Sequence, residues 1–442
     1  MDSSKDPRRA LPKYRELAGT FAASLGIQVL TIASGVLVAR MLQPEGRGVL
    51  AAVQLWPNLI AAIGLLGINY SLALRAAKSK DGLPSLAKMG VGFGLATSTV
   101  AIAVLWFVGP ALLPDSLEDG TRLTRYVLLM LPASMVCSYL QAVDQGAGRL
   151  HSFNLVRSLF PVVYLVAVVV FWVLDLQEVV WIVTALIFAN VVTALYRVHL
   201  TGWQCLAPPY WISGWTEVAK EGSPFLATSV VQLVRDNFAR LVLLYILLPA
   251  DLGLYVVAIT SSALHGTLGK SITTIVLPRS SALSLEDAAR DSAKIFRVMA
   301  IVNIAVSVLM ALVLPVLIPL FFGRAFLGAV VPALVLLGAQ YFGNLGAILD
   351  EGLRGQARPL VGMIAGLCGV LLFGLTSVAF SRLAGLGGVA TAATLGEALY
   401  CLIILVYYYV KFRLALLPQG ADFRFLASAI NSLYRRMDLR NA

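Results

Sequence analysis

The feature that most constrains this chain is a series of twelve apolar stretches, each about as long as a lipid bilayer is thick. Backbone N–H and C=O groups in lipid must bond within their own segment, so each stretch of about 20 apolar residues is predicted to be a transmembrane helix. The predicted spans are 17–41, 49–73, 89–109, 124–143, 153–174, 179–198, 223–248, 253–277, 297–320, 329–349, 359–380 and 387–410. Of the 442 residues, 59% are hydrophobic and 13% are charged. Average soluble domains carry about 25% charged residues, so this composition excludes a soluble globule.

The turn residues between the spans repeat along the chain. Pro44 and Gly48, in LQPEGRG, recur 205 positions later as Pro249 and Gly253, in LLPADLG. The same order is kept by Pro110 with Pro315, Pro114 with Pro319, and, 209 positions apart, Gly146 with Gly355 and Arg149 with Arg358. These matches indicate a duplicated six-helix unit, an architecture found mostly in transporters.

The basic residues predict how the spans are oriented. With both termini in the cytoplasm, the cytoplasmic segments hold 24 of the 34 Lys and Arg residues and the external loops hold four. This asymmetry follows the positive-inside rule and gives the two halves the same orientation. The predicted parts are a cytoplasmic tail at 1–16, a first bundle at 17–200, a cytoplasmic linker at 201–222, a second bundle at 223–410 and a cytoplasmic tail at 411–442. Within the last tail, 422–439 reads as an amphipathic basic helix on the inner leaflet.

Composition and motifs argue against an enzyme. The net charge of +11 is spread through short loops and tails, which favours the anionic lipid leaflet as the partner and excludes nucleic acid. Four scattered cysteines give no disulfide framework, and three histidines share no metal-ligand spacing. No external loop exceeds about 15 residues, so the external loops are too short to position a set of catalytic groups. We predict no cofactor, no bound metal and no catalytic residue; a membrane enzyme of polysaccharide assembly is the less favoured alternative.

The candidate site residues are polar side chains within the apolar spans. Arg235 and Asp236 lie near the middle of the seventh span, Arg240 follows Asp236 by one helical turn, and Lys270 lies in the eighth span. A cation at the bilayer centre costs about 2.5–3.5 kcal/mol unless it pairs or faces water. One hypothesis is a water-filled cavity whose arginines bind phosphate oxygens. The alternative is a structural pair of Asp236 with Arg240, with the other two cations reaching toward the membrane surface.

Weaker candidates lie in other spans. Arg40 is near the outer end of the first helix, and Gln28, Asn58 and Asn303 place neutral polar groups in apolar helices, where they bind a substrate or hydrogen-bond to a neighbouring helix. Glu397, near the middle of the twelfth span, either takes up and releases a proton during transport or stays neutral and hydrogen-bonded.

Four segments occur in a characteristic order: LVARMLQPEGRGVLAAVQL, RDNFARLVLLYILLPADLGLYVVAITSSALHGTLGKSITTIVLPRSS, LFFGRAF and EGLRGQARPL. Their order and spacing resemble the bacterial polysaccharide and O-antigen repeat-unit flippases of the multidrug, oligosaccharidyl-lipid and polysaccharide exporter superfamily. The similarity covers roughly 15–410. Twelve spans fit the repeat-unit flippases better than the lipid II flippases, which usually have fourteen.

This resemblance implies that two six-helix bundles form a V around a central cationic cavity. In such flippases the cavity accepts an undecaprenyl-pyrophosphate-linked oligosaccharide and moves it to the outer leaflet of the bacterial inner membrane by alternating access. The implied substrate-binding residues are Arg235, Arg240, Lys270, Arg40, Gln28 and Asn58, with Asp236 and Glu397 serving coupling or pairing. The implied partners are the polymerase and chain-length proteins of the same pathway. A cation-coupled multidrug exporter of the same fold is the alternative.

Overall fold

A computed structural model describes most of the chain as α-helix. It covers residues 14–65, 67–78, 82–114, 117, 120–210, 214–281, 283–356, 358–420, 422–424 and 428. Within these ranges the side chains of 14–23, 25, 223–232, 234–236, 239, 267–272, 274, 275, 277 and 278 are not described. Over the described residues the structure contains helices and no strand.

The chain divides into two compact units, Met1–Leu233 and Val234–Ala442. The long helix α8 (Trp215–Ile246) begins in the first unit and ends in the second. The short helix η4 (Trp203–Leu206), within the segment predicted as a linker, packs against α3 and α7 of the first unit.

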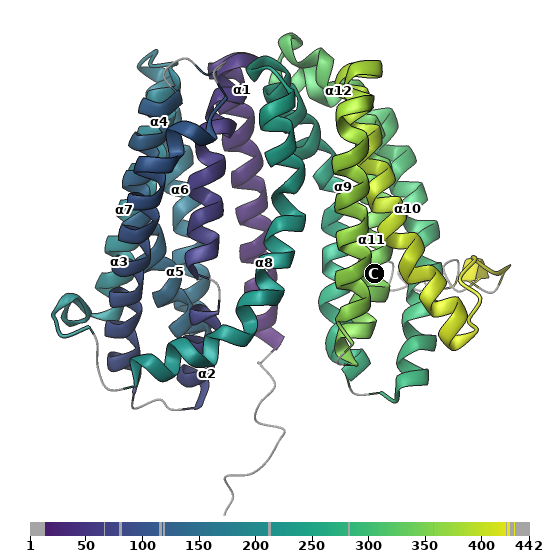
Figure 1. Cartoon of the computed structure of the whole chain (residues 1–442), viewed down its shortest axis with the longest axis horizontal. Helices are drawn as coiled ribbons and strands as arrows, with labels where there is room; N and C mark the ends of the chain where they lie inside the picture. Colours follow the sequence, from purple (N-terminus) through teal and green to yellow (C-terminus); the bar gives the residue numbers. More distant parts are fainter. Residues whose placement is uncertain are drawn as a thin grey trace, which may run out of the picture. The chain divides into compact units, whose positions relative to one another are not determined.

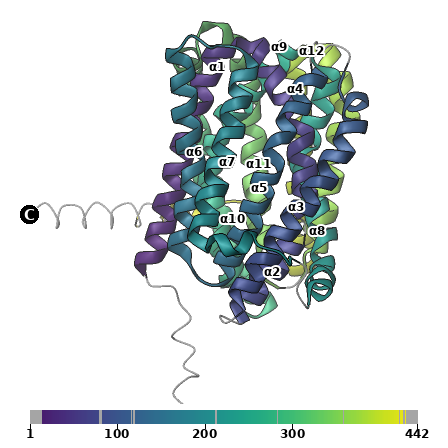
Figure 2. The ribbon, with the colours of Figure 1, turned by 90° about the vertical axis from the view of Figure 1, so that its left-hand side faces the viewer.

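The helices of the first unit pack lengthwise beside one another (Figure 1). They are α1 (Tyr14–Leu65), α2 (Ile68–Lys78), α3 (Leu83–Val108), η2 (Gly109–Leu112), α4 (Gly120–Val127), η3 (Leu128–Met130), α5 (Leu131–Gly146), α6 (Leu150–Val173) and α7 (Val179–Thr201). Figure 2 shows α6, α7, α5 and α3 from the side of this unit. Its main apolar core joins α1, α3, α6 and α7 through fully buried residues such as Leu50, Leu105, Val168 and Ile182.

The first two predicted spans differ from the structure at their ends. They form one continuous helix, α1, interrupted only at Gln43, which has φ 56°. Pro44 disfavours helical geometry at the residue before it, so the LQPEGRG segment gives a one-residue kink where a loop was expected. The second span then breaks at Gly67, whose φ of +87° favours glycine, and the chain continues as α2.

The second unit contains the end of α8 and the remaining helices. They are α9 (Pro249–Ser281), α10 (Leu285–Phe322), η5 (Arg324–Ala329), α11 (Val330–Gly355) and α12 (Leu360–Phe412). The last two predicted spans merge into α12, which bends at Ala384 and Gly385 (φ 55°). The apolar core of the second unit joins α10, α11 and α12 through Phe296, Ile348, Tyr400 and Ile404.

Length and apolarity place the chain in a membrane. Eight helical segments in the described part of the chain are long and apolar enough to span a bilayer. They correspond to ten of the twelve predicted spans because α1 and α12 each match two, and the other two predicted spans match α8 and α9. Large apolar side chains such as Phe107, Leu312 and Leu375 are 72–81% exposed, as expected of a lipid-facing surface. The predicted class, an all-α polytopic membrane protein, is confirmed.

Candidate functional site

Three of the strongest predicted site residues lie on α8 and α9, but their side chains fall outside the described residues. Arg235 and Asp236 are on α8, and Lys270 is on α9. Arg240, one turn after Asp236, is described: its side chain is exposed, and Nη1 donates to Asn237 Oδ1 at 3.5 Å. The proposed substrate contacts of these four residues therefore stay predictions.

The weaker candidates of the first unit all lie on α1. Gln28, Arg40 and Asn58 are each exposed, so none of the three is sealed inside its own bundle. The carbonyl oxygen of Arg40 accepts a hydrogen bond from Gln43 Nε2 at 2.8 Å, next to the kink of α1. Exposure of these side chains is a requirement for substrate binding, and their role stays a prediction.

Glu397 lies half-buried on α12, against α11 of the same unit. Its Oε2 lies 3.0 Å from the position that a Cβ on Gly343 would occupy. A residue larger than glycine at 343 would therefore press on this carboxyl group. The predicted role of Glu397 in coupling or pairing stays a prediction.

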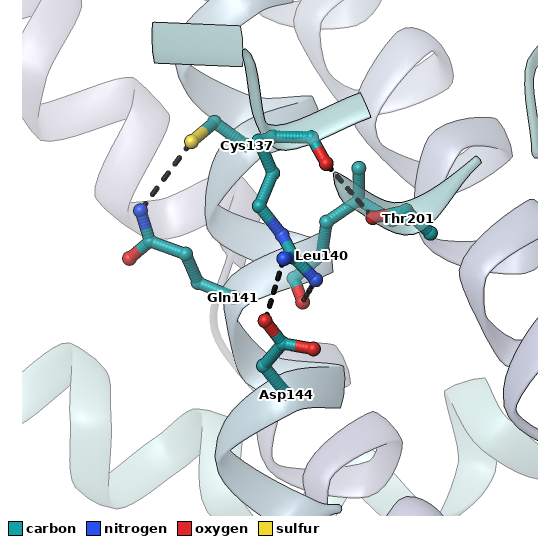
Figure 3. A network of polar contacts seen from close by, with 6 residues as sticks. Cys137, Leu140, Gln141, Asp144 and Thr201 are labelled. Atoms are coloured by element: carbon teal, nitrogen blue, oxygen red, sulfur yellow. Dashed lines mark hydrogen bonds and ion pairs between the residues drawn. The ribbon is translucent and has the colours of Figure 1, made fainter. Parts of the chain in front are cut away.

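The most buried ion pair among the described residues joins α5 to α7 (Figure 3). Arg197 Nη1 lies 2.5 Å from Asp144 Oδ2, and both side chains are at most 3% exposed. Arg197 Nη2 also donates to the carbonyl oxygen of Leu140 at 3.0 Å. One arginine thus joins the end of α7 to the end of α5.

Arg197 lies inside the predicted sixth span, 179–198, but has no place among the candidate site residues. The structure places it in the last turns of α7, which ends at Thr201. Arginine is almost never fully buried unless it is paired, so its burial in the bundle depends on the partner that packing supplies. Its partner, Asp144, is 53 positions earlier, and this separation gives no local signal.

The second unit repeats this arrangement with different partners. Asp350, in α11, is 206 positions after Asp144 and is equally buried. Its Oδ2 lies 3.0 Å from Arg354 Nη2 and accepts a hydrogen bond from the hydroxyl group of Tyr400, on α12, at 3.3 Å. In each unit a buried aspartate near the end of the fourth span is thus bonded to a residue of the sixth span.

A glycine follows each aspartate by two positions. A Cβ on Gly146 would overlap the carbonyl oxygen of Ala73, on α2, and a Cβ on Gly352 would overlap Ser292 Oγ, on α10. The pattern D-x-G, spaced by almost the same interval as the repeated prolines, is the signal that could have identified this pair of sites from the sequence.

An ion pair in the first unit ties the beginning of α8 to α2. Arg75 donates to both carboxylate oxygens of Glu221, each at 2.9 Å. The hydrogen bond from Arg75 holds the pKa of Glu221 below its ordinary value, since it stabilises the charged carboxylate. One residue later, Gly222 packs so closely on Gly67 that a Cβ would lie 2.7 Å from the Gly67 carbonyl carbon.

The end of α12 leads into a segment tied to α10 in the second unit. Arg297 Nε lies 3.0 Å from Asp422 Oδ2, and Arg297 Nη1 donates to the carbonyl oxygen of Ala415 at 2.9 Å. Burial acts to raise the pKa of Asp422, but bonds from the Gln419 N–H and Arg297 outweigh it and hold the pKa low. Most of the predicted amphipathic helix at 422–439 lies outside the described residues.

The chain matches one protein-family model, described as "Polysaccharide biosynthesis protein", over residues 37–331. The match covers about two thirds of the chain. This chain belongs to that family. A search of curated protein sequences found no match.

Solved structures of membrane transporters have a similar fold. The lipid II flippase MurJ, in an inward closed conformation, superimposes with a TM-score of 0.72 at 14% identity, covering 94% of this chain and 90% of MurJ. An inward-facing multidrug resistance MATE family transporter of the MOP superfamily gives 0.63 at 15% identity, with 89% and 94% covered. A MOP superfamily transporter from Pyrococcus furiosus gives 0.61 at 15% identity, with 90% and 95% covered. The chain therefore has the fold of these transporters and of this flippase.

Proposed function

We propose that this polysaccharide biosynthesis protein is a flippase for an undecaprenyl-pyrophosphate-linked oligosaccharide repeat unit. It moves the unit across a bacterial inner membrane by alternating access, for assembly of a cell-surface polysaccharide. The observation that carries the proposal is the family match over residues 37–331 on a fold shared with a lipid II flippase. The proposal includes the predicted bundle and tail boundaries, the cytoplasmic termini, and partnership with the polymerase and chain-length proteins.

The physical need for such a protein is the cost of moving sugars through hydrocarbon. Each buried polar group without a hydrogen bond costs several kcal/mol, so a sugar head group does not cross the bilayer at a useful rate unaided. A polar route through the protein lowers this barrier. In the proposal, Arg235, Arg240 and Lys270 attract the pyrophosphate, and Arg40, Gln28 and Asn58 contact the head group.

A deletion strain of the source organism tests the function. Loss of the protein is expected to stop surface polysaccharide export and to leave lipid-linked repeat units on the inner leaflet, where an impermeant sugar-modifying enzyme cannot reach them in intact cells. Complementation with Arg235→Ala/Arg240→Ala is expected to reach the membrane in normal amount without restoring export. Arg290→Ala, which changes an exposed arginine on α10, is the matched control and is expected to restore it.

Two results would redirect the proposal. Normal export in the deletion strain, together with raised sensitivity to amphipathic drugs, would indicate a multidrug exporter. Lipid-linked repeat units that reach the outer leaflet but are not polymerised would indicate a role in polymer assembly. Full export with both arginines replaced would contradict the cationic site while leaving the flippase function standing.

A further inference from the structure

A histidine lies at the centre of a polar cluster inside the second unit. His265, on α9, is fully buried. Its Nε2 is 3.2 Å from the carbonyl oxygen of Asn303 and 3.0 Å from Ser307 Oγ, both on α10. Its Nδ1 is 3.1 Å from Nδ2 of Asn344, on α11. Three helices therefore meet at one imidazole ring.

The partners of the ring define its neutral form. A carbonyl oxygen only accepts, so Nε2 carries a hydrogen and donates it to Asn303. The amide nitrogen of Asn344 only donates, so Nδ1 is the unprotonated nitrogen that accepts from it. This assignment satisfies both ring nitrogens of the neutral ring without moving any atom.

The same partners also fit the protonated ring after one rotation. An imidazolium donates from both nitrogens, and the Asn303 carbonyl oxygen and Ser307 Oγ already accept on one side. A half-turn of the Asn344 amide would present its oxygen to Nδ1–H in place of the NH₂ group. The ring can thus exchange one proton with no backbone movement, whereas a site lined by apolar side chains would leave the new charge unpaired.

The cluster has spare hydrogen-bonding capacity. The Oδ1 and Nδ2 atoms of Asn303 are buried and find no hydrogen-bond partner among the described residues. An unsatisfied buried polar group costs about 1–3 kcal/mol, so a sealed, purely structural site would not be expected to keep two of them. Gln340 adds another polar group: its Oε1 lies 2.7 Å from the position of a Cβ on Gly266, the residue after His265.

On α10 and α11, the charged residues lie several positions along the helix from the residues that contact the His265 ring. On α10 the last is Arg297, six positions before Asn303, and on α11 the first is Asp350, six positions after Asn344. Six helical positions correspond to about 9 Å. The other ionisable groups near in sequence or packing are Tyr255, Lys270 and Asp251 on α9, Arg324 on η5, Tyr341 on α11, and Glu397, Tyr400 and Cys401 on α12.

Among these, Glu397 packs against Gly343, the residue before Asn344. The side chain of Lys270 is not described; its backbone position is five residues after His265, about 140° around the helix. Among the described residues, the printed hydrogen bonds of the ring are all to neutral polar groups.

We propose that His265, held between Asn303, Ser307 and Asn344, is the binding site for a proton that drives transport. The driving role rests on the proposed flippase function, whereas proton binding does not. A ligand shifts a conformational equilibrium only by its differential affinity for the two states. Charge on the ring would strengthen its bonds to α10 and rotate the amide of α11, so proton binding favours one arrangement of these helices over another.

Histidine NMR of the full-length protein in lipid nanodiscs tests the site directly. The chain has three histidines, and the other two, His151 and His199, are exposed. With ring-¹⁵N histidine, His151→Gln and His199→Gln assign the spectrum. His265 is expected to start as the Nε2–H form and to bind a second ring proton as the pH is lowered.

A pair of substitutions at Asn344 separates a proton site from a structural histidine. Asn344→Asp supplies a permanent acceptor and is expected to raise the midpoint of the titration by about 1–3 pH units. Asn344→Leu removes the acceptor and is expected to lower it, while the signals of His151 and His199 stay unchanged in both variants. A ring that stays neutral at pH 5 in the wild type, or a midpoint that is the same in both variants, would overturn the proposal.

Export assays then connect the proton to transport. In the complemented deletion strain, His265→Gln is expected to abolish the dependence of export on the membrane proton gradient, and His199→Gln to keep it. Gradient-dependent export that persists in His265→Gln would overturn the driving role. If deletion of the protein leaves export intact, the flippase function fails, but the titration of His265 still stands or falls on the NMR result.

Discussion

At the scale of single residues, burial decides how much an ion pair contributes to the stability of the fold. Asp144 and Arg197 are at most 3% exposed, whereas Glu286 and Arg290, 3.6 Å apart on α10, are 77% and 65% exposed. Removing one partner of a buried pair leaves an uncompensated charge, which costs about 3–5 kcal/mol. An exposed pair contributes about 0–1 kcal/mol because water and salt screen it.

We therefore predict that Asp144→Ala lowers the free energy of unfolding by about 3–5 kcal/mol, measured by denaturant unfolding in detergent micelles. Glu286→Ala is the matched control and is expected to change it by less than about 1 kcal/mol. The double variant Asp144→Leu/Arg197→Met removes both charges, so its free energy of unfolding is expected to fall less than that of Asp144→Ala. Equal effects of Asp144→Ala and Glu286→Ala would contradict the importance of burial.

At the scale of helices, close packing at glycine fixes how neighbouring elements meet. Gly146 and Gly352 each lie where a Cβ would overlap an atom of another helix, whereas a Cβ on Gly35, on α1, has no atom within 4 Å. All three positions are helical, so the cost of a methyl group depends on the neighbour and not on the backbone conformation.

Gly146→Ala and Gly352→Ala are each expected to lower stability by about 1–3 kcal/mol through overpacking. Gly35→Ala, in contrast, is expected to leave stability unchanged or to raise it by up to about 1 kcal/mol, since alanine favours helix. Thermal unfolding of the three purified variants, followed by tryptophan fluorescence, makes the comparison. A loss for Gly35→Ala as large as for the other two would show that helix packing is not the cause.

At the scale of the whole molecule, α8 is the helix that passes from one unit to the other. Its beginning is fixed to the first unit by Arg75–Glu221 and by the contact of Gly222 with Gly67. In the second unit, Phe238 of α8 packs edge-on against Phe373 of α12, with ring centroids 6.4 Å apart. A change that weakens the contacts of Arg75 with Glu221 and of Gly222 with Gly67 would therefore release the beginning of α8 from the first unit.

Acid is expected to release the beginning of α8. The pKa of Glu221 is lowered in the folded protein, so its stabilising contribution is complete above the ordinary value of 4.5 and is lost as the pH falls through the lowered value. Amide hydrogen exchange at Val218 and its neighbours, corrected for intrinsic rates, is expected to rise as the pH falls below about 4.5.

Glu221→Gln supplies the matched comparison for this acid effect. The variant is expected to exchange faster at neutral pH and to lose the additional acid-dependent step. Glu286→Gln, which changes an exposed carboxylate of α10, is expected to behave like the wild type. An acid step that survives in Glu221→Gln would assign the effect to another group.

The sequence alone determined the class of protein, the number of spans and the duplication, since these depend on apolar length and on turn residues that act locally. It also carried the family, which the match over residues 37–331 shows. Pro44 marks a real break in the helix for the same reason, although the chain bends more tightly there than expected, whereas the break at Gly67 falls inside the predicted span 49–73. The partners of Asp144, Asp350 and His265 were decided only by the tertiary structure. Arg197, Tyr400 and Asn344, which bond to these three residues, each lie on another helix. No local sequence pattern specifies which side chains of two packed helices will come within hydrogen-bonding distance.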